Sequence, residues 1–584
     1  MRYLFTMLCV LGLATAMGQT TIDYPRDYFR NPLNIPIRLA ANFGELRPNH
    51  YHMGLDIRTM QRENLPVYAA ADGYIARVVI EPGGFGQAIY LAHPNGYTTL
   101  YAHLNAFFPA LDAWVKTRQY KLERWECSLD IPAGLFSVKK GDQIALSGNR
   151  GGSQGPHLHF EIRRTADDTN LNPLLFGMPV PDNTSPGILR LAVYDRTLST
   201  YEQKPVIYPV HKQAAAAKAA GPASYIPSSA LITLASPRAS FAISAFDTQT
   251  GSANPNGIYM AALFDNERPV ISFRMNDISY NDTRGINAHI DYRTRATGGP
   301  WLQHLSQLPG YATRSIYHPS AAGLDGVVDC SDGAVHAIRI EVRDVDGNIS
   351  QLRFKVQCPA DRLKGRGVPA SGKLFAPGML DASETEDCAF YLGEKSLYDS
   401  VHLDQHIVGF PGAGHSLPNA VSSLHAIGAT YIPLQESMLV RLRLNTASTD
   451  TSTAHIVMVC IAGDRRDVQR PEWQGAWASA RFRSFGNFQL VRDDEAPVIT
   501  PLVTTAKTLS FYVKDNLGAI RDVRPVLDPT PAGAGGQWLC FTNDKGLAYI
   551  YTFDEHCPPG KHTLRIEASD VAGNKSVVTY TFTR

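Results

Sequence analysis

The chain has almost no excess of charge of either sign and few long apolar runs, and each absence excludes a class of protein. Its 584 residues carry 55 Lys and Arg against 54 Asp and Glu, for a net charge of +1. A protein that binds nucleic acid normally carries a marked basic excess, so we expect no nucleic-acid partner. No apolar stretch is long enough to cross a bilayer comfortably, so we expect no membrane span.

The N-terminus has the pattern of a secretory signal peptide. Arg2 supplies a short positive region, residues 3–14 form an apolar region, and Ala14-Thr15-Ala16 is a small-x-small cleavage site. We therefore expect residues 1–18 to be removed and the mature protein to be exported to the periplasm, the cell envelope or the medium.

Cysteine is scarce, and its spacing excludes a thiolate metal site because the chain has no CxxC or Cys/His motif of that kind. One of the eight cysteines lies in the signal peptide, and an exported compartment permits disulfides between the others. Two expected pairs bracket one β-rich stretch each, a third pair is a further candidate, and one thiol is left over: Cys330 with Cys358, Cys540 with Cys557, Cys388 with Cys460, and Cys127 alone.

Helical periodicity is also rare, so the chain is predicted to be mostly β. A chain of 584 residues is too long for one hydrophobic core, and three to five domains are expected. The predicted organisation is a signal peptide at 1–18, a first β-domain at 19–190, a linker (alanine-rich at 212–220) plus a β-sandwich at 191–360, a β-rich domain of uncertain topology at 361–492, and a second β-sandwich at 493–584.

An internal repeat supports the two sandwiches. Residues 336–350 recur as residues 562–576, and each copy reads as a strand, an Asp-x-x-Gly-Asn turn and a second strand. This pattern resembles the closing hairpin of immunoglobulin-like domains, and the first sandwich is expected from about Pro237. The acidic residues of the turn, such as Asp344, would also suit a calcium loop. Turn chemistry explains them more simply, because no full run of oxygen ligands follows.

Two histidines alternate with apolar residues in the stretch 155–162. Because a strand points successive side chains to opposite faces, Leu158 and its apolar neighbours are predicted to be buried. His157 and His159 then share the other face, where imidazoles can bind zinc. A surface strand with two incidental histidines is the alternative.

Other candidate site residues occur upstream. His52 and Asp56 are predicted to lie on a loop that enters a strand, because Pro48 and Gly54 disfavour a helix. His103 ends a predicted strand that follows the Asn-Gly hairpin signal at 95–96. The glycine-rich segment before the His-x-His motif lacks the Gly-Lys-Ser/Thr ending of a phosphate-binding loop.

Taken together, these motifs resemble the lysostaphin-type (LytM-type) zinc metallopeptidases, which cut peptidoglycan peptides. The resemblance covers residues 42–173 and rests on His52-x-Gly54-x-Asp56, Tyr101-Ala102-His103-Leu104 and Gly155-Pro156-His157-Leu158-His159. It implies an antiparallel β-sheet peptidase domain of the duplicated-hybrid-motif type, with one Zn²⁺ per chain. His52, Asp56 and His159 match the zinc ligands, and His103 and His157 match the two catalytic histidines that do not bind the metal.

The resemblance also implies a mechanism and a substrate. A zinc-activated water, assisted by the two histidines, would hydrolyse peptide bonds in peptidoglycan stems or cross-links. Glu161 is expected to point to solvent, although it would also suit a role in orienting a histidine. The alternatives are a catalytically inactive wall-binding scaffold or regulator of another hydrolase, and a peptidase of other exported proteins. The β-domains could contact a cell-envelope protein.

One departure from the family pattern is an insertion at 105–136. Its apolar residues fall near helical spacing, so it is predicted to carry an amphipathic helix that begins near Pro109. Trp114 and Trp125 would either line the substrate cleft or dock the insertion onto its own domain; burial preferences favour docking.

Overall fold

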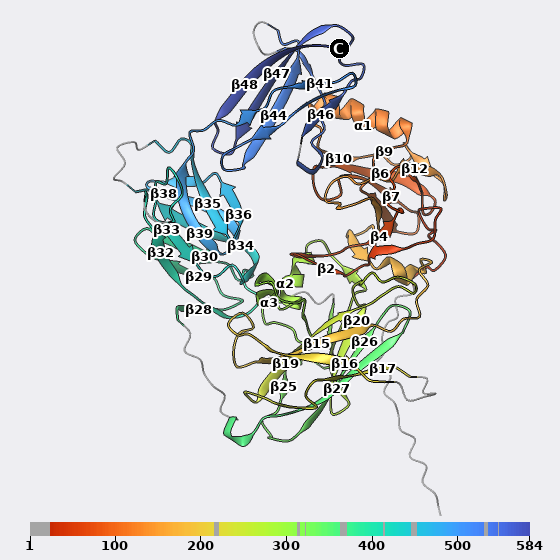
Figure 1. The fold of residues 1–584 in the computed structure, drawn as a ribbon, viewed down its shortest axis with the longest axis vertical. Coiled ribbons are helices and arrows are strands. Elements are labelled where there is room, and N and C mark those ends of the chain that lie inside the picture. Colours follow the sequence, from red (N-terminus) through yellow and green to blue (C-terminus); the bar gives the residue numbers. More distant parts are fainter. Residues whose placement is uncertain are drawn as a thin grey trace, which may run out of the picture.

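The computed structural model describes residues 24–214, 221–311, 316–321, 323–362, 371–412, 415–445, 452–530, 535–546 and 548–584. The expected signal peptide and most of the alanine-rich segment at 212–220 lie outside these residues. The described chain is mostly β, as predicted, and its strands group into four units. In Figure 1 these units follow one another around a ring, so the blue C-terminal unit lies beside helix α1 of the red N-terminal unit.

The N-terminal unit is built on an antiparallel sheet with the strand order β1-β4-β13-β8-β7-β6-β10. A three-stranded sheet, β5-β12-β9, and the hairpin β2-β3 complete it. The bounds are β1 Leu39–Ala41, β2 Leu46–Arg47, β3 His50–Tyr51, β4 Leu55–Arg58, β5 Pro66–Tyr68, β6 Gly73–Ile80, β7 Gln87–Ala92, β8 Tyr97–Ala102, β9 Ala106–Phe107, β10 Cys127–Asp130, β11 Ser137–Val138, β12 Gln143–Leu146, β13 His157–Arg164 and β14 Thr169–Leu171.

Local sequence signals predict these strands well. Gly96, with φ at +82°, occupies the turn between β7 and β8, where the Asn-Gly signal placed it. The apolar row of β13 is fully buried in the core of the unit, as its alternation predicts: Leu158, Phe160 and Ile162. Because β13 pairs with β4 on one edge and β8 on the other, it is a central strand rather than a surface strand.

The insertion forms helix α1 (Pro109–Leu122) and strand β10. Leu111 and Val115 are buried in the N-terminal core, with Trp114 and Trp125 packed against it. The insertion is therefore docked onto its own domain. The predicted apolar face ends early, however, because Leu122 is 53% exposed.

The second unit begins at strand β15, which pairs along its length with β19, well before Pro237. Its sheet runs β23-β19-β15-β16-β17-β27-β26-β20-β21-β24, and the predicted closing hairpin is β26-β27. The main bounds are β15 Gly187–Asp195, β16 Val206–Lys212, β17 Ala223–Pro227, β19 Arg238–Phe246, β20 Met260–Asp265, β21 Arg268–Arg274, β22 Asp277–Ile278, β23 Gln303–His304, β24 Tyr317–Pro319, β26 His336–Arg343, β27 Ile349–Gln357, α2 Ile286–His289 and α3 Tyr292–Ala296.

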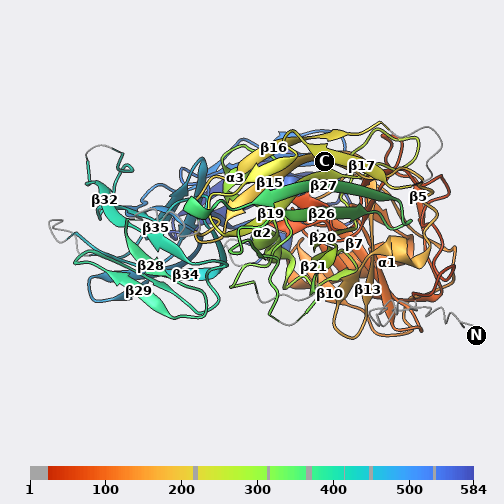
Figure 2. The same cartoon turned by 90° about the horizontal axis from the view of Figure 1, so that it is seen from below.

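The third unit has two five-stranded sheets, β29-β30-β34-β38-β37 and β32-β33-β39-β35-β36, and Figure 2 shows it extending away from the N-terminal sheet. The C-terminal unit has the sheets β45-β44-β47-β48 and β41-β42-β46, and the predicted hairpin is β47-β48. The main bounds are β29 Asp381–Glu384, β30 Cys388–Leu392, β32 Gln405–Gly409, β33 Leu424–Ile427, β34 Pro433–Arg443, β35 Ile456–Ala462, β36 Arg465–Gln469, β37 Glu472–Gln474, β38 Trp477–Ser484, β39 Gly486–Arg492, β41 Val503–Thr504, β42 Thr508–Phe511, β43 Val513–Lys514, β44 Ile520–Leu527, β45 Gln537–Trp538, β46 Tyr549–Thr552, β47 Lys561–Asp570 and β48 Lys575–Thr583.

Among the described residues, no helix is both long and apolar enough to cross a membrane.

The N-terminal and second units share a core. Phe43, Tyr51 and Met53 belong to the N-terminal unit, yet their side chains are buried among those of the second unit. Strand β14 also pairs with β22, so the second unit extends the N-terminal sheet. Because Tyr51 and Met53 flank His52, the second unit fixes the backbone on both sides of a candidate site residue.

The C-terminal unit contacts helix α1. The ring of Tyr120 stacks on His556 with a centroid distance of 3.5 Å, and its edge meets Trp538. Lys116 forms ion pairs with Asp554 at 2.8 Å and with Glu555 at 3.1 Å. The insertion therefore joins the first and last units of the chain.

The expected disulfides are wrong, because the seven described cysteines are free thiols. Packing explains one of the three failures directly. Cys540 lies against the N-terminal core beside the insertion, with Cys127 packed on the same core, whereas Cys557 is buried in the core of the C-terminal unit. Cys388 and Cys460, the third expected pair, lie on β30 and β35 in different sheets of the third unit.

Candidate active site

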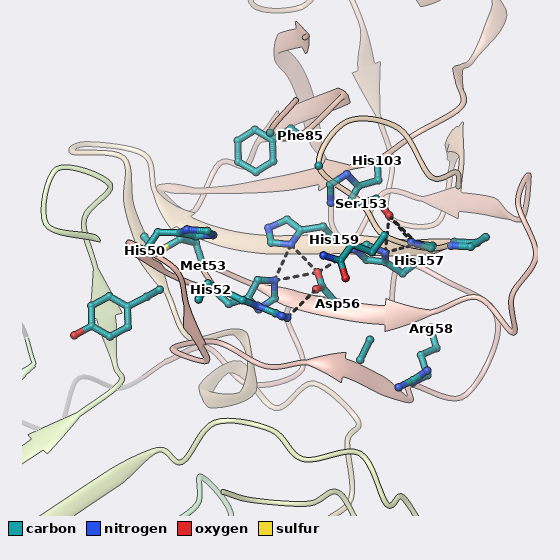
Figure 3. Close-up of a pocket in the computed structure, with 18 of the residues that line it drawn as sticks. His50, His52, Met53, Asp56, Arg58, Phe85, His103, Ser153, His157 and His159 are labelled. Atoms are coloured by element: carbon teal, nitrogen blue, oxygen red, sulfur yellow. Dashed lines mark hydrogen bonds and ion pairs between the residues drawn. The ribbon is translucent and has the colours of Figure 1, made fainter. Parts of the chain in front are cut away.

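A cleft of about 740 Å³ contains all five predicted site residues. Its walls come from the ends of β3, β4 and β13, from the turn at Gly84-Phe85 and from the glycine-rich loop before β13. The second unit contributes Tyr280 and Thr283 to the same lining. Figure 3 shows the histidines pointing toward one another around Asp56.

His52, Asp56 and His159 converge at the centre of this cleft. Asp56 lies directly opposite His159 in the β4–β13 ladder, and His52 lies in the segment that enters β4, as predicted. The Asp56 Oδ1 atom is 3.0 Å from His52 Nε2 and 2.8 Å from His159 Nδ1. The two imidazole nitrogens are 3.1 Å apart. All three side chains are buried, so three atoms that can bind a metal ion lie within one small volume.

In His52 and His159, the ring nitrogen that faces away from Asp56 makes a hydrogen bond to another group. The ring nitrogen nearer Asp56 is therefore available to bind a cation. His52 donates its Nδ1–H to the Asn42 carbonyl oxygen at 2.7 Å, and His159 donates its Nε2–H to Glu161 Oε1 at 2.9 Å. When the opposite nitrogen of each ring is deprotonated, its lone pair faces the same small volume as Asp56 Oδ1. Two imidazoles and one carboxylate, with atoms about 3 Å apart, fit a tetrahedral ion with bonds of about 2.0–2.2 Å.

Electrostatics keep the central carboxylate ionised. Burial raises the pKa of Asp56, but His52, His157 and His159 together hold it well below its usual range. Burial lowers the pKa of His159, yet its hydrogen bonds to Asp56 and Glu161 raise it to about 9. A cation at this position therefore competes with a proton for His159 Nδ1.

Glu161 does not point to solvent as expected; it is fully buried. Besides His159, it accepts hydrogen bonds from Arg163 Nε at 2.7 Å, Asn170 Nδ2 at 2.7 Å and the Tyr280 hydroxyl at 2.8 Å. Burial raises the pKa of its carboxyl, but Arg163, His159 and Tyr280 lower it to about 2. The expectation fails because β13 is central and the second unit covers its polar face.

His103 and His157 lie beside the three convergent groups. His157 Nε2 is 3.3 Å from Asp56 Oδ1, and the rings of His103 and His157 are 4.7 Å apart. His103 donates its Nδ1–H to the Arg150 carbonyl at 2.8 Å, and His157 donates its Nδ1–H to the Gly155 carbonyl at 2.8 Å. Burial and the two neighbouring histidines lower the pKa of His103 to about 3, so its ring is neutral with a free Nε2.

The loop at 149–155 therefore orients both of these histidines, and the C-terminal unit holds this loop. Asp544 Oδ1 accepts a hydrogen bond from Gly151 N at 2.8 Å, and Lys545 Nζ donates to the Ser153 carbonyl at 2.6 Å. Lys545 N also donates to the Pro82 carbonyl at 2.7 Å. Ser153 Oγ in turn lies 3.2 Å from His157 Nδ1.

Sequence reasoning missed the contributions of Tyr280, Asp544 and Lys545. Arg163, two residues beyond Glu161 on the same strand face, is the one local signal for a buried carboxylate network. Nothing near Tyr280 in the sequence indicates that it lines the cleft, and nothing near Lys545 indicates that it holds the loop at 149–155.

Comparison with known proteins agrees with this geometry. A model of peptidase family M23 matches residues 50–120 and 135–173, and its gap falls within the insertion. A model of the Zu5-like domain matches residues 380–493, which correspond to the third unit.

The similar curated proteins match about a quarter of the chain. An uncharacterized metalloprotease of Haemophilus influenzae is 33% identical over 163 residues, which are 26% of this chain and 28% of that protein. The DD-carboxypeptidase/endopeptidase Mpg of Neisseria meningitidis is 34% identical over 152 residues, or 25% of this chain and 29% of that protein. The matches thus span less than a third of these relatives.

Solved structures of low identity align with the same region. The catalytic domain of the M23 protein EnpA from Enterococcus faecalis is 20% identical, with a TM-score of 0.19, and the match covers 26% of this chain and 98% of that domain. The catalytic domain of lysostaphin from Staphylococcus simulans is 22% identical, with a TM-score of 0.17, over 24% of this chain and 91% of that domain. On the family model and the curated relatives, the N-terminal part of the chain, residues 50–173, belongs to peptidase family M23.

Proposed function

We propose that this protein is an exported zinc metalloendopeptidase that hydrolyses peptide bonds in peptidoglycan stem peptides or cross-links. The observation that carries the proposal is the convergence of His52, Asp56 and His159 in one buried cluster, with two further histidines alongside. The family assignment supports it, as do relatives named as peptidoglycan DD-endopeptidases, such as ShyA of Vibrio cholerae, which is 29% identical over 143 residues. Export rests on the N-terminal signal pattern and on those names.

In this proposal the zinc ligands are His52 Nε2, Asp56 Oδ1 and His159 Nδ1. Three protein ligands leave a fourth position open, which is typical of catalytic rather than structural zinc. When bound, zinc lowers the pKa of a coordinated water toward neutrality and so supplies a nucleophile at physiological pH. The anionic Asp56 offsets part of the charge of the ion, and Glu161 orients His159 from behind.

The roles of His103 and His157 follow from their tautomers. Each ring donates its Nδ1–H to a backbone carbonyl, so each Nε2 is available to accept a proton from the attacking water. Once protonated, an imidazole beside the reacting carbonyl stabilises the negative charge that develops on oxygen and returns the proton to the leaving amine. Loop 149–155 keeps both rings in position for this transfer.

An inactive scaffold is the competing function, and two arguments disfavour it. An inactive relative typically lacks a ligand or a catalytic histidine, whereas here all five positions are filled. The acceptors that fix the tautomers are also present, on Asn42, Glu161, Arg150 and Gly155. A binding scaffold would need none of these.

The His159→Ala variant tests the metal site. We expect the mature protein to release new amino groups from purified peptidoglycan, and both His159→Ala and a chelator to abolish that release because each removes the metal. Added Zn²⁺ should restore the chelated wild type alone. His50→Ala is the matched control, since His50 lines the same cleft outside the ligand set. Activity that persists in His159→Ala would contradict the assignment.

His103→Ala and His157→Ala separate catalysis from metal binding. Loss of a positioned acid or base costs roughly 10²–10⁴-fold in rate, so we expect kcat to fall by that order while bound zinc, measured by atomic emission, stays near one per chain. Loss of zinc from either variant would instead identify that histidine as a ligand.

Glu161→Gln should weaken zinc binding without removing a ligand. Replacing a residue that orients a metal-bound imidazole costs about 10–100-fold in metal affinity, which competition with a chromogenic chelator would measure. The exposed Glu126→Gln provides the control, and thermal melting shows whether the fold survives the unpaired Arg163. Equal zinc affinity in Glu161→Gln and wild type would contradict the proposal that Glu161 orients His159.

Lys545→Met tests whether the C-terminal unit positions loop 149–155. We expect kcat to fall several-fold while KM and zinc content change little, because the loop loses its hydrogen bond at Ser153. Lys545→Arg should restore part of the activity, and the exposed Lys507→Met in the same unit should leave it unchanged. If Lys545→Met instead shifts melting temperature and all kinetic constants together, the contact is merely structural.

A further inference from the structure

Three aspartates meet where the N-terminal unit joins the second unit. Asp182 lies in the segment that leaves the N-terminal unit, Asp247 directly follows strand β19, and Asp344 directly follows strand β26. One carboxylate oxygen from each lies within 4.8 Å of the other two. The sequence alone suggested turn chemistry for Asp344, but it did not bring the other two carboxylates to the same place.

The carboxylate of Asp247 is only partly compensated, by a hydrogen bond from the backbone of Thr248. The residue is 8% exposed, and its Oδ1 atom is buried without a hydrogen-bond partner among the described residues. Burial, together with the negative charges of Asp182 and Asp344, raises the pKa of Asp247 to about 7. A buried acceptor in a native structure is normally paired, so an unpaired one among like charges indicates a missing partner.

A small cavity of about 30 Å³ lies between these groups and is lined by Asp182, Asp247, Asp344 and Asp346. That volume suits one ion or water molecule rather than an organic ligand. Asn256, whose Oδ1 accepts a hydrogen bond from Asn254 Nδ2, is also in the lining. The available ligands are therefore oxygens alone, with no Cys or His among the charged groups, and this set selects a hard cation.

We propose that Asp182, Asp247 and Asp344 bind one calcium ion at the junction between the N-terminal and second units. Calcium–oxygen bonds of about 2.3–2.6 Å allow ligand atoms to lie up to about 5 Å apart across the ion, and the three carboxylate oxygens lie within that separation of one another. Calcium also accepts irregular coordination, whereas magnesium requires a near-ideal octahedron. Asp182 Oδ1 accepts hydrogen bonds from Thr184 N and Thr250 Oγ1, so Oδ2 is the Asp182 oxygen left for the ion. The two oxygens of Asp344 accept hydrogen bonds from Asn348 N and Nδ2, and each keeps a second lone pair.

The internal repeat provides a related arrangement. In the C-terminal unit, Asp493, Asp515 and Asp570 also lie within 4.8 Å of one another. Asp570 occupies the repeat position of Asp344, and Asp493 likewise lies in the segment that enters its unit. Each cluster has one buried oxygen without a hydrogen-bond partner among the described residues, on Asp247 and on Asp515. Asp515 is half-buried as a residue, whereas Asp247 is only 8% exposed, so the calcium site is assigned to the first cluster.

An ion bound at Asp247 would order a loop that is hydrogen-bonded to the N-terminal unit. This loop begins at Asp247, and its Gln249 bonds to the backbone of Leu39 and Ile37 at 3.2 and 2.9 Å. Its far end exchanges two hydrogen bonds with Asn42, at 2.8 and 2.9 Å. Calcium is therefore expected to stabilise the junction between the units.

Thermal melting of the full chain in calcium-free buffer with added Zn²⁺ tests the site. Extracellular calcium modules bind with a Kd on the order of 10⁻⁴–10⁻³ M, so we expect 10 mM CaCl₂ to raise the melting temperature of the wild type by a few degrees. Isothermal titration with CaCl₂ should show a matching binding heat. Asp247→Asn should lose this shift and, without calcium, melt at or above the wild type, because it removes a buried charge.

Two further variants complete the experiment. Asp344→Asn should also lose the calcium-induced rise in melting temperature, and it replaces Asp247→Asn in the test if that variant does not fold. Asp464→Asn, at an exposed turn of the third unit, should keep the rise. A wild type that shows neither shift nor heat overturns the proposal. So does a full calcium response in both Asp247→Asn and Asp344→Asn, or a response that disappears in Asp570→Asn alone.

Discussion

The pairing of β4 with β13 is the constraint on which the candidate site depends. Its register sets Asp56 opposite His159, so two donor atoms on different segments meet without any loop having to place them. A shift of one residue would turn either side chain to the opposite face of the sheet. The register is held from both sides, since Leu158 and Phe160 fill the core while β8 pairs with the other edge of β13.

The second unit covers the polar face of this sheet and completes a buried network of charged and polar groups around Glu161. The hydroxyl of Tyr280 bonds to Glu161, and Arg163 lies against the same carboxylate with only 2% of its side chain exposed. Removing either partner would leave an uncompensated charge away from water, so the network favours one arrangement strongly. Because Tyr51 and Met53 insert into the second unit on either side of His52, the two units form one structural body around the cleft.

The features that the sequence predicts are local, and those it misses are long-range. Strand β13, the Asn95-Gly96 hairpin and the helix from Pro109 follow from alternation, turn chemistry and helical spacing. The five site residues follow from motifs that a known family shares, and the structure brings all five into one cleft. Their proposed roles await experiment.

The errors have a common physical origin. Glu161 looks like a solvent-facing strand residue until Tyr280, 119 positions away, covers it. The expected disulfides assumed that cysteines near each other in sequence are near in space, but Cys540 packs on the N-terminal core instead. No local pattern reports such contacts, because they depend on how complete units pack together.

The contact between Lys545 and Ser153 joins positions 392 residues apart. A ribosome releases a protein from its N-terminus, so the M23 domain emerges long before the side chain that steadies its glycine-rich loop. An unfinished or clipped chain would carry the five site residues without that support. Ordering of the loop that holds His103 and His157 is thereby linked to a unit that is synthesised much later than the loop itself.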